Sequence, residues 1–187
     1  MFHNNNTCPF TKWALAHSSN LKLWGGYMAE YSIDLAQELS KASNTILSVG
    51  LNSQDAKRAA LYIGLVACEI AIKSALEKAG KPIGQIKANG HGLSKLLDEL
   101  GACTVLDEIS NGVLTRVSAT RIRSLIVDSN YDATVGMLLQ AEQFGASKFP
   151  NEIRYGDALK HYPALVIARL SEKVVAWVKL HFDNLQI

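Results

Sequence analysis

Glu69 and Lys73 are two oppositely charged residues that lie four positions apart in the most apolar part of the sequence. On an exposed helix such a pair is a routine support worth a few tenths of a kcal/mol. Here the neighbours include Val66 and Ile72, so the carboxylate is expected to be buried, and a buried carboxylate needs a partner. We therefore expect Glu69 to be bonded to a basic group. The pair is either a structural link at a helix seam or the anchor of a polar pocket.

His91 stands between two glycines at the head of a predicted helix, in the segment NGHGLSKLL. A histidine at this position can cap free backbone groups. It can also touch a ligand, because the N-terminus of a helix attracts anions. Both roles are open from the sequence, and His91 is one candidate partner for Glu69, together with Lys73 and Arg154.

Arg154 and His161 form a second candidate pair, in the segment EIRYGDALKH. An arginine that holds a phosphate and a histidine that moves a proton are the two parts needed for metal-independent RNA cleavage. The alternative is an arginine that pairs with a nearby carboxylate, followed by an exposed histidine. Arg154 is expected to point inward, where its guanidinium can hold Glu69 or a ligand phosphate with two parallel hydrogen bonds.

Several common kinds of site are excluded by the absence of their motifs. The sequence has no phosphate-binding G-x-x-x-x-G-K-[ST] loop, no dinucleotide-binding G-x-G-x-x-G after a strand, no H-E-x-x-H and no G-x-S-x-G. The five histidines lack metal-ligand spacing, and Cys8, Cys68 and Cys103 form no C-x-x-C pair. We expect neither a metal nor a cofactor, and the isolated cysteines favour a reducing compartment, the cytoplasm.

The bulk composition is that of an ordinary globular protein, with 48% hydrophobic and 19% charged residues in a chain of 187. The formal net charge of +2 gives no general electrostatic case for nucleic-acid binding, although a small basic site remains compatible with it. The first twenty residues lack a secretory signal. No charge-free apolar run reaches about 18 residues, so no membrane span is expected.

Hydrophobic periodicity predicts an all-α fold, with a polar arm at 1–25 and one helical domain at 26–187. Ser53 is expected to cap the central helix, and Gly80 and Pro82 to end it. Asn111-Gly112 is a candidate break in a later helix, and no convincing strand pattern is apparent. The expected helices are 27–47, 53–79, 91–101, 104–127, a short one within 128–145, and 163–183, with loops at 80–90 and 145–160.

The order of these segments resembles the HEPN family, a group of helical proteins associated with nucleotides and RNA. The resemblance rests on the helix AALYIGLVACEIAIKSAL with its E-x-x-x-K spacing, on GHGLSKLLDEL, and on EIRYGDAL before a closing helix. It implies an up-and-down bundle of four to five helices, like the substrate-binding subunits of nucleotidyltransferases. It also implies a homodimer with a nucleotide or RNA ligand. Apolar helix faces larger than one small bundle covers point to the same dimer.

For the site, the resemblance implies a pocket for a nucleotide or an RNA phosphate, lined by Glu69, Lys73, His91, Arg154 and Tyr155. Family members that cleave RNA carry an arginine and a histidine separated by four to six residues. Arg154 and His161 resemble this pair, because six residues lie between them. In that alternative Arg154 stabilises the scissile phosphate and His161 is the general acid or base of an endoribonuclease from a toxin or defence system. A third alternative is a protein-interaction module without nucleotide binding. The implied partners are a nucleotidyltransferase or an antitoxin.

Overall fold

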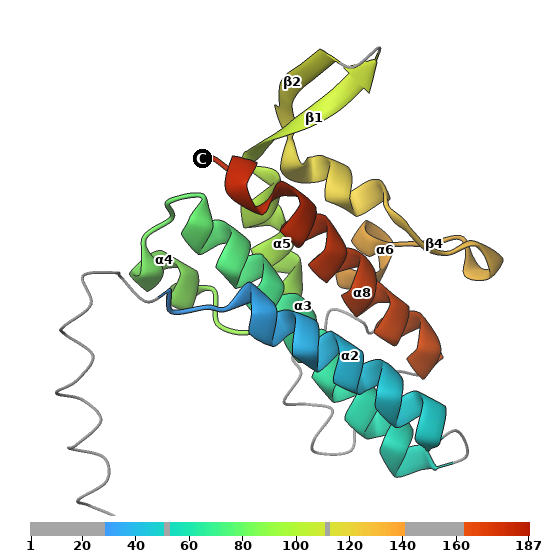
Figure 1. Cartoon of the computed structure of the whole chain (residues 1–187). Helices are drawn as coiled ribbons and strands as arrows, with labels where there is room; N and C mark the ends of the chain where they lie inside the picture. Colours follow the sequence, from blue (N-terminus) through green and yellow to red (C-terminus); the bar gives the residue numbers. More distant parts are fainter. Residues whose placement is uncertain (1–28, 51–52, 111–112, 141–162) are drawn as a thin grey trace, which may run out of the picture.

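The computed structural model describes residues 29–50, 53–110, 113–140 and 163–187, and over these ranges the chain is mainly helical with a few short strands (Figure 1). The predicted arm at 1–25 and loop at 145–160 lie outside the described residues. So do three of the predicted site residues, Arg154, Tyr155 and His161.

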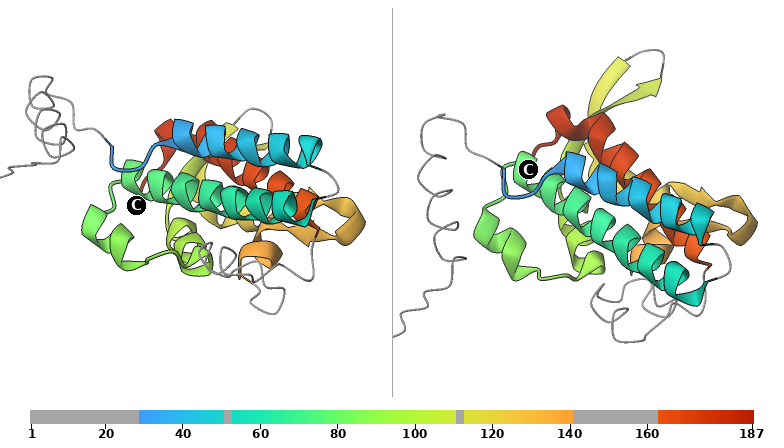
Figure 2. Two further views of the ribbon diagram at one scale, coloured as in Figure 1. Left: turned by 90° about the horizontal axis from the view of Figure 1, so that it is seen from below. Right: turned by 60° about the horizontal axis from the view of Figure 1, so that its bottom comes forward.

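Three helices form the body of the described fold: α2 (Ile33–Val49), α3 (Gln54–Lys78) and α8 (Ala164–His181), which lie side by side in every view (Figures 1 and 2). The Ser32 and Ser53 hydroxyls cap α2 and α3, accepting hydrogen bonds from the backbone N–H groups of residues 35 and 56. Gly50 ends α2 and Pro163 precedes α8. The three predicted helices are therefore confirmed, although α2 begins six residues later than expected.

Small side chains let these three helices approach closely. A Cβ atom built on Gly64 of α3 would lie 3.1 Å from the hydroxyl of Ser43 on α2. That hydroxyl donates to the carbonyl of Ala60 at 2.8 Å, and the hydroxyls of Ser40 and Ser171 are 2.8 Å apart between α2 and α8. The buried hydroxyls of Ser40, Ser43 and Ser171 are therefore hydrogen-bonded within the seam, as most buried polar groups are.

The central helix α3 is apolar on nearly all sides. It is long and apolar enough to cross a membrane by length and composition alone, but 72% of its most apolar window is buried inside the fold. Burial of this kind is typical of a core helix. The absence of a membrane span stays a prediction.

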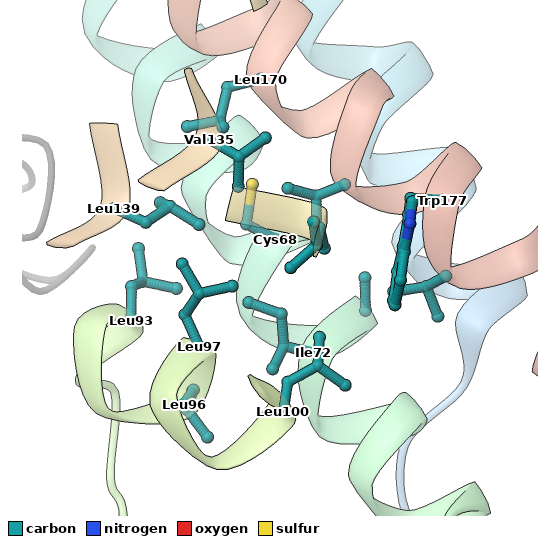
Figure 3. Packing of buried hydrophobic residues seen from close by; sticks show 14 of the residues in the cluster. Cys68, Ile72, Leu93, Leu96, Leu97, Leu100, Val135, Leu139, Leu170 and Trp177 are labelled. Carbon is teal, nitrogen blue, oxygen red and sulfur yellow. The ribbon is translucent and has the colours of Figure 1, made fainter. Parts of the chain in front are cut away.

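Two further helices complete the core beside α3. The leucines of α5 (Leu93–Gly101) pack against α3, and α6 (Val135–Gln140) closes the same core, which also receives side chains from α8 (Figure 3). A short helix, α4 (Ile83–Ala88), occupies most of the predicted loop 80–90, so that prediction was wrong. Pro82 stands at its N-cap, where the fixed φ of proline suits a helix start, and Ile86 is buried.

The predicted helix at 104–127 is wrong, and with it the all-α class in its strict form. Strand β1 (Thr104–Ser110) pairs antiparallel with β2 (Val113–Ser118), and the 3-10 helix η1 (Ala119–Ser124) follows. The segment is rich in β-branched residues, whose stiff side chains suit a strand. Asn111-Gly112, the candidate break in the predicted helix, is also the preferred dipeptide of a two-residue hairpin turn. These two residues lie outside the described ones.

A second, smaller hairpin follows. β3 (Ile126–Asp128) pairs with β4 (Ala133–Thr134), with the 3-10 helix η2 (Ser129–Tyr131) between them. Asp132 has a φ of 47°, in the left-handed region that aspartate tolerates better than most residues. Of the helix predicted within 128–145, the described residues show only α6.

The β1–β2 hairpin projects from the helical body and is tied to it at its base (Figure 1). Thr104 and Gln186 exchange backbone hydrogen bonds of 2.7 and 3.0 Å. Arg116 donates to the carbonyl of Asn184 at 3.2 Å. The residues after α8 therefore close the open end of the hairpin.

Candidate functional site

Glu69 lies at the centre of a small polar cluster in the wall of α3. One carboxylate oxygen, Oε1, accepts a hydrogen bond from Lys73 Nζ at 2.8 Å. The Nδ1 atom of His91 lies 3.0 Å from both carboxylate oxygens. The side chains of Glu69 and Lys73 are 9% and 7% exposed. The expectation that Glu69 is buried and bonded to basic groups is confirmed.

The carboxylate fixes the orientation of the imidazole. A carboxylate only accepts hydrogen bonds, so Nδ1 of His91 carries the proton and donates it, and Nε2 is the nitrogen left for other partners. The His91 side chain is 62% exposed, in contrast to the buried Glu69 that holds it. The cluster therefore presents an oriented imidazole on a largely exposed side chain, and its Nε2 atom can accept a proton or, in the charged imidazolium, donate one.

The turn before α5 positions His91 over the carboxylate. Gly90 has a φ of +60°, which favours glycine, and Gly92 is the N-cap of α5. No side chain caps α5, so the histidine does not fill the capping role considered above. Asn89 is buried, and its Nδ2 atom has no hydrogen-bond partner among the described residues. Among the described residues, no side chain caps the first-turn backbone N–H groups of α5, which lie next to His91.

The backbone segment 29–32 lies against the same part of α3. The Glu77 carboxylate accepts hydrogen bonds from the backbone N–H groups of Glu30, at 2.8 Å, and Tyr31, at 2.9 Å. Lys73 Nζ lies 5.3 Å from the centroid of the Tyr31 ring, within the range of a cation–π contact. Glu30 also pairs with Lys87 of α4 at 2.7 Å, and this hydrogen bond raises the pKa of Lys87.

Sequence reasoning missed Tyr31 and Glu77. A signal for Glu77 was present, because Glu69, Lys73 and Glu77 recur every fourth residue and so share one face of α3. No sequence pattern marks Tyr31, which reaches the cluster only through tertiary packing. The structure thus brings together three predicted residues, Glu69, Lys73 and His91. The roles given to Arg154, Tyr155 and His161 stay predictions. Within the described ranges, no group of three or more His, Cys, Asp or Glu residues could hold a metal ion.

Cys68 precedes Glu69 and points into the core rather than into the cluster (Figure 3). Complete burial raises the pKa of its thiol to about 12. At about pH 8 only roughly one ten-thousandth of such a thiol is in the reactive thiolate form. We expect Cys68 to stay unmodified when the native protein is treated with iodoacetamide, and to react at an ordinary rate in the urea-unfolded protein. Peptide mapping by mass spectrometry measures this, and rapid labelling of Cys68 in the native state would contradict it.

Comparison with known proteins adds no family assignment: no protein-family model, curated protein or solved structure matches this chain.

Proposed function

We propose that this chain is a HEPN-like helical binding protein that takes a phosphate-bearing ligand, a nucleotide or an RNA phosphate, at His91 and the head of α5. The observation that carries the proposal is the Glu69–His91 contact, in which a buried carboxylate holds an exposed imidazole in one orientation. An imidazole held in this way can present Nε2 to a ligand in a defined direction.

The surroundings of His91 supply what a phosphate requires. In the imidazolium form Nε2–H donates a charge-assisted hydrogen bond, which is stronger than a neutral one. The uncapped first turn of α5 adds backbone N–H donors and the positive end of the helix dipole. Lys73 opposes the charge of Glu69, so the carboxylate that orients the histidine does not leave the site net negative.

His91→Ala should weaken phosphate binding by about tenfold or more, because a hydrogen bond to a charged group contributes roughly 1.5–3 kcal/mol. The measurement is fluorescence anisotropy with a short 5′-phosphorylated RNA, and calorimetric titration with the four ribonucleoside triphosphates. Unlike Glu69, His91 is largely exposed, so its removal is expected to leave the fold intact.

The matched control is Lys57→Ala. It removes a cation from the same helix as Lys73, but sixteen residues, or roughly 24 Å, further along it. We expect Lys57→Ala to bind like the wild type. If the wild type binds neither probe, or if both variants weaken binding equally, the proposal fails.

The alternative of a metal-independent ribonuclease rests on Arg154 and His161, which lie outside the described residues, so no described contact favours it. An assay with the same 5′-phosphorylated RNA distinguishes the binding protein from the ribonuclease. Metal-free cleavage that is lost in His161→Ala and kept in His91→Ala would favour the ribonuclease and count against a site centred on His91.

Dimerisation and partners remain part of the proposal. The resemblance implies a homodimer and a nucleotidyltransferase or antitoxin partner, in the cytoplasm. Large apolar side chains are exposed on two helices of the body, at Leu35 of α2 and at Leu165 and Leu180 of α8. Scattered apolar residues are normal on a monomer, so they are compatible with a dimer without arguing for one. The interaction-module alternative predicts a protein partner and no binding of either phosphate probe.

A further inference from the structure

A hollow of about 330 Å³ lies where η2 and the end of β3 meet α8. It is separate from the Glu69 cluster, because η2 and β4 lie at the opposite end of the described fold from α4 (Figures 1 and 2). Its volume is at the small end of the range for ligand pockets. Most of the residues that line it are polar or charged.

A buried carboxylate fixes the arginine of this hollow. Asp128 is only 6% exposed, and its Oδ1 atom accepts a hydrogen bond from the backbone N–H of Asn130 at 2.9 Å. Its Oδ2 atom accepts one from Nη1 of Arg169. Both carboxylate oxygens are thus in use. The Arg169 side chain is still 43% exposed, so part of its planar fork of N–H donors faces the hollow in a fixed orientation.

Two further charges of opposite sign line the same hollow. Glu172 and Lys173 follow Arg169 by three and four residues on α8, which places all three on one face of the helix. Glu172 and Lys173 are exposed, and neither makes an ion pair within the part of the chain that the structure describes. The hydroxyl of Ser129 and the amide of Asn130 add neutral hydrogen-bonding groups.

The balance of these charges selects the ligand. Asp128 and Glu172 together cancel Arg169 and Lys173, so a phosphate dianion would leave the hollow with a large uncompensated negative charge. A ligand with one carboxylate and one ammonium group leaves no net charge. Its carboxylate can accept from the Arg169 fork and from Lys173, and its ammonium can donate to Glu172.

We propose that this hollow binds a small zwitterion of the free α-amino acid type. The carboxylate of the ligand lies against Arg169 and Lys173, and its ammonium group lies against Glu172. Val127 is the one apolar residue of the described lining, and because it is only 6% exposed it offers a small apolar contact to a short aliphatic side chain. The assignment does not depend on the phosphate site, which lies on other elements.

The test is a titration of the full-length chain with L-leucine and with two analogues that each lack one of its charged groups. The analogue 4-methylpentanoate lacks the ammonium, and 3-methylbutylamine lacks the carboxylate. Binding is followed by NMR chemical shifts at up to about 10 mM, ten times a Kd of ~1 mM. We expect leucine to bind with a Kd of about 1 mM or below, and each half to bind at least tenfold more weakly. No binding of leucine, or equally tight binding of the carboxylate alone, would overturn the proposal.

Three variants assign the contacts. Glu172→Gln should reduce the preference for leucine over 4-methylpentanoate, and Lys173→Gln should weaken both of these ligands. Arg169→Lys keeps the positive charge beside Asp128 but loses the planar fork of N–H donors, so it should weaken the binding of leucine strongly.

The control is Lys179→Gln, which removes the same charge as Lys173→Gln from α8 but outside the hollow. Should Arg169→Lys fail to fold, the two exposed positions decide the matter, and wild-type affinity and preference in both would refute the assignment.

Discussion

Replacing Glu69 with alanine should lower the free energy of unfolding by about 3–5 kcal/mol, because it leaves the ammonium of Lys73 buried without its carboxylate. Both side chains are more than nine-tenths buried, so water cannot replace the lost partner. The Tyr31 ring would remain beside Lys73, but a ring face compensates a buried cation only in part. Equilibrium unfolding in urea measures the change.

Two further variants separate the stranded charge from the loss of side-chain volume. Glu38→Ala removes an exposed glutamate that pairs with Lys41, and it should change the stability by less than about 1 kcal/mol. The double variant Glu69→Leu with Lys73→Met replaces the pair by apolar side chains and should recover most of the loss. A Glu69→Ala variant as stable as Glu38→Ala would show that the pair is not buried in solution.

Leu97→Ala should cost about 2–5 kcal/mol of stability, the range for removing a leucine side chain from a packed core. Leu97 is fully buried and lies among Leu93, Leu100 and Ile72 between α5 and α3 (Figure 3). Because α5 carries His91 at its head, the same change should also weaken binding at the proposed phosphate site. Denaturant unfolding and anisotropy on the same preparation check both effects.

Leu180→Ala is the matched control for this core variant. It makes the same change in a helix, but at a position that is 74% exposed, and it should alter the stability by no more than about 0.5 kcal/mol. A similar loss in both variants would mean that the packing of α5 on α3 contributes little.

The sequence predicted the long helices because they combine a strong apolar period with clear end signals. α3 begins after a serine cap and ends just before Gly80, and α8 begins after Pro163. The pattern of leucines likewise located α5. These features are local in the chain, so no knowledge of the tertiary fold was needed.

The prediction of a helix over the β1–β2 segment was wrong because the apolar residues of this segment fit two periods. Val105, Ile109 and Val113 fall at four-residue steps, as on a helix, and they also fall at even steps, as on one face of a strand. The β-branched side chains and the Asn-Gly dipeptide favour the strand. The pairing of Thr104 with Gln186, far away in the sequence, adds a contact that no local pattern contains.

Part of the candidate site was predictable for a similar reason. Glu69 and Lys73 are charged residues in an apolar helix. A charged residue at a position that is expected to be buried can be recognised from the sequence alone. The sequence offered three candidate partners for Glu69, and only tertiary packing selects His91 as the one that joins Lys73 there. The sequence contains no comparable signal for Tyr31 or Asp128, because an aromatic residue before a helix and an aspartate near a turn are both common.

The body of α2, α3 and α8 also sets an order of folding. α2 and α3 are neighbours in the sequence and can pair at once, whereas more than eighty residues separate α3 from α8. Closing so long a loop carries an entropic cost that is met before the contacts of α8 form. Until then α3, apolar on nearly every side, has only part of its surface covered. We therefore expect folding to pass through a stage in which part of this apolar helix is still uncovered, and we expect aggregation to compete with folding at that stage.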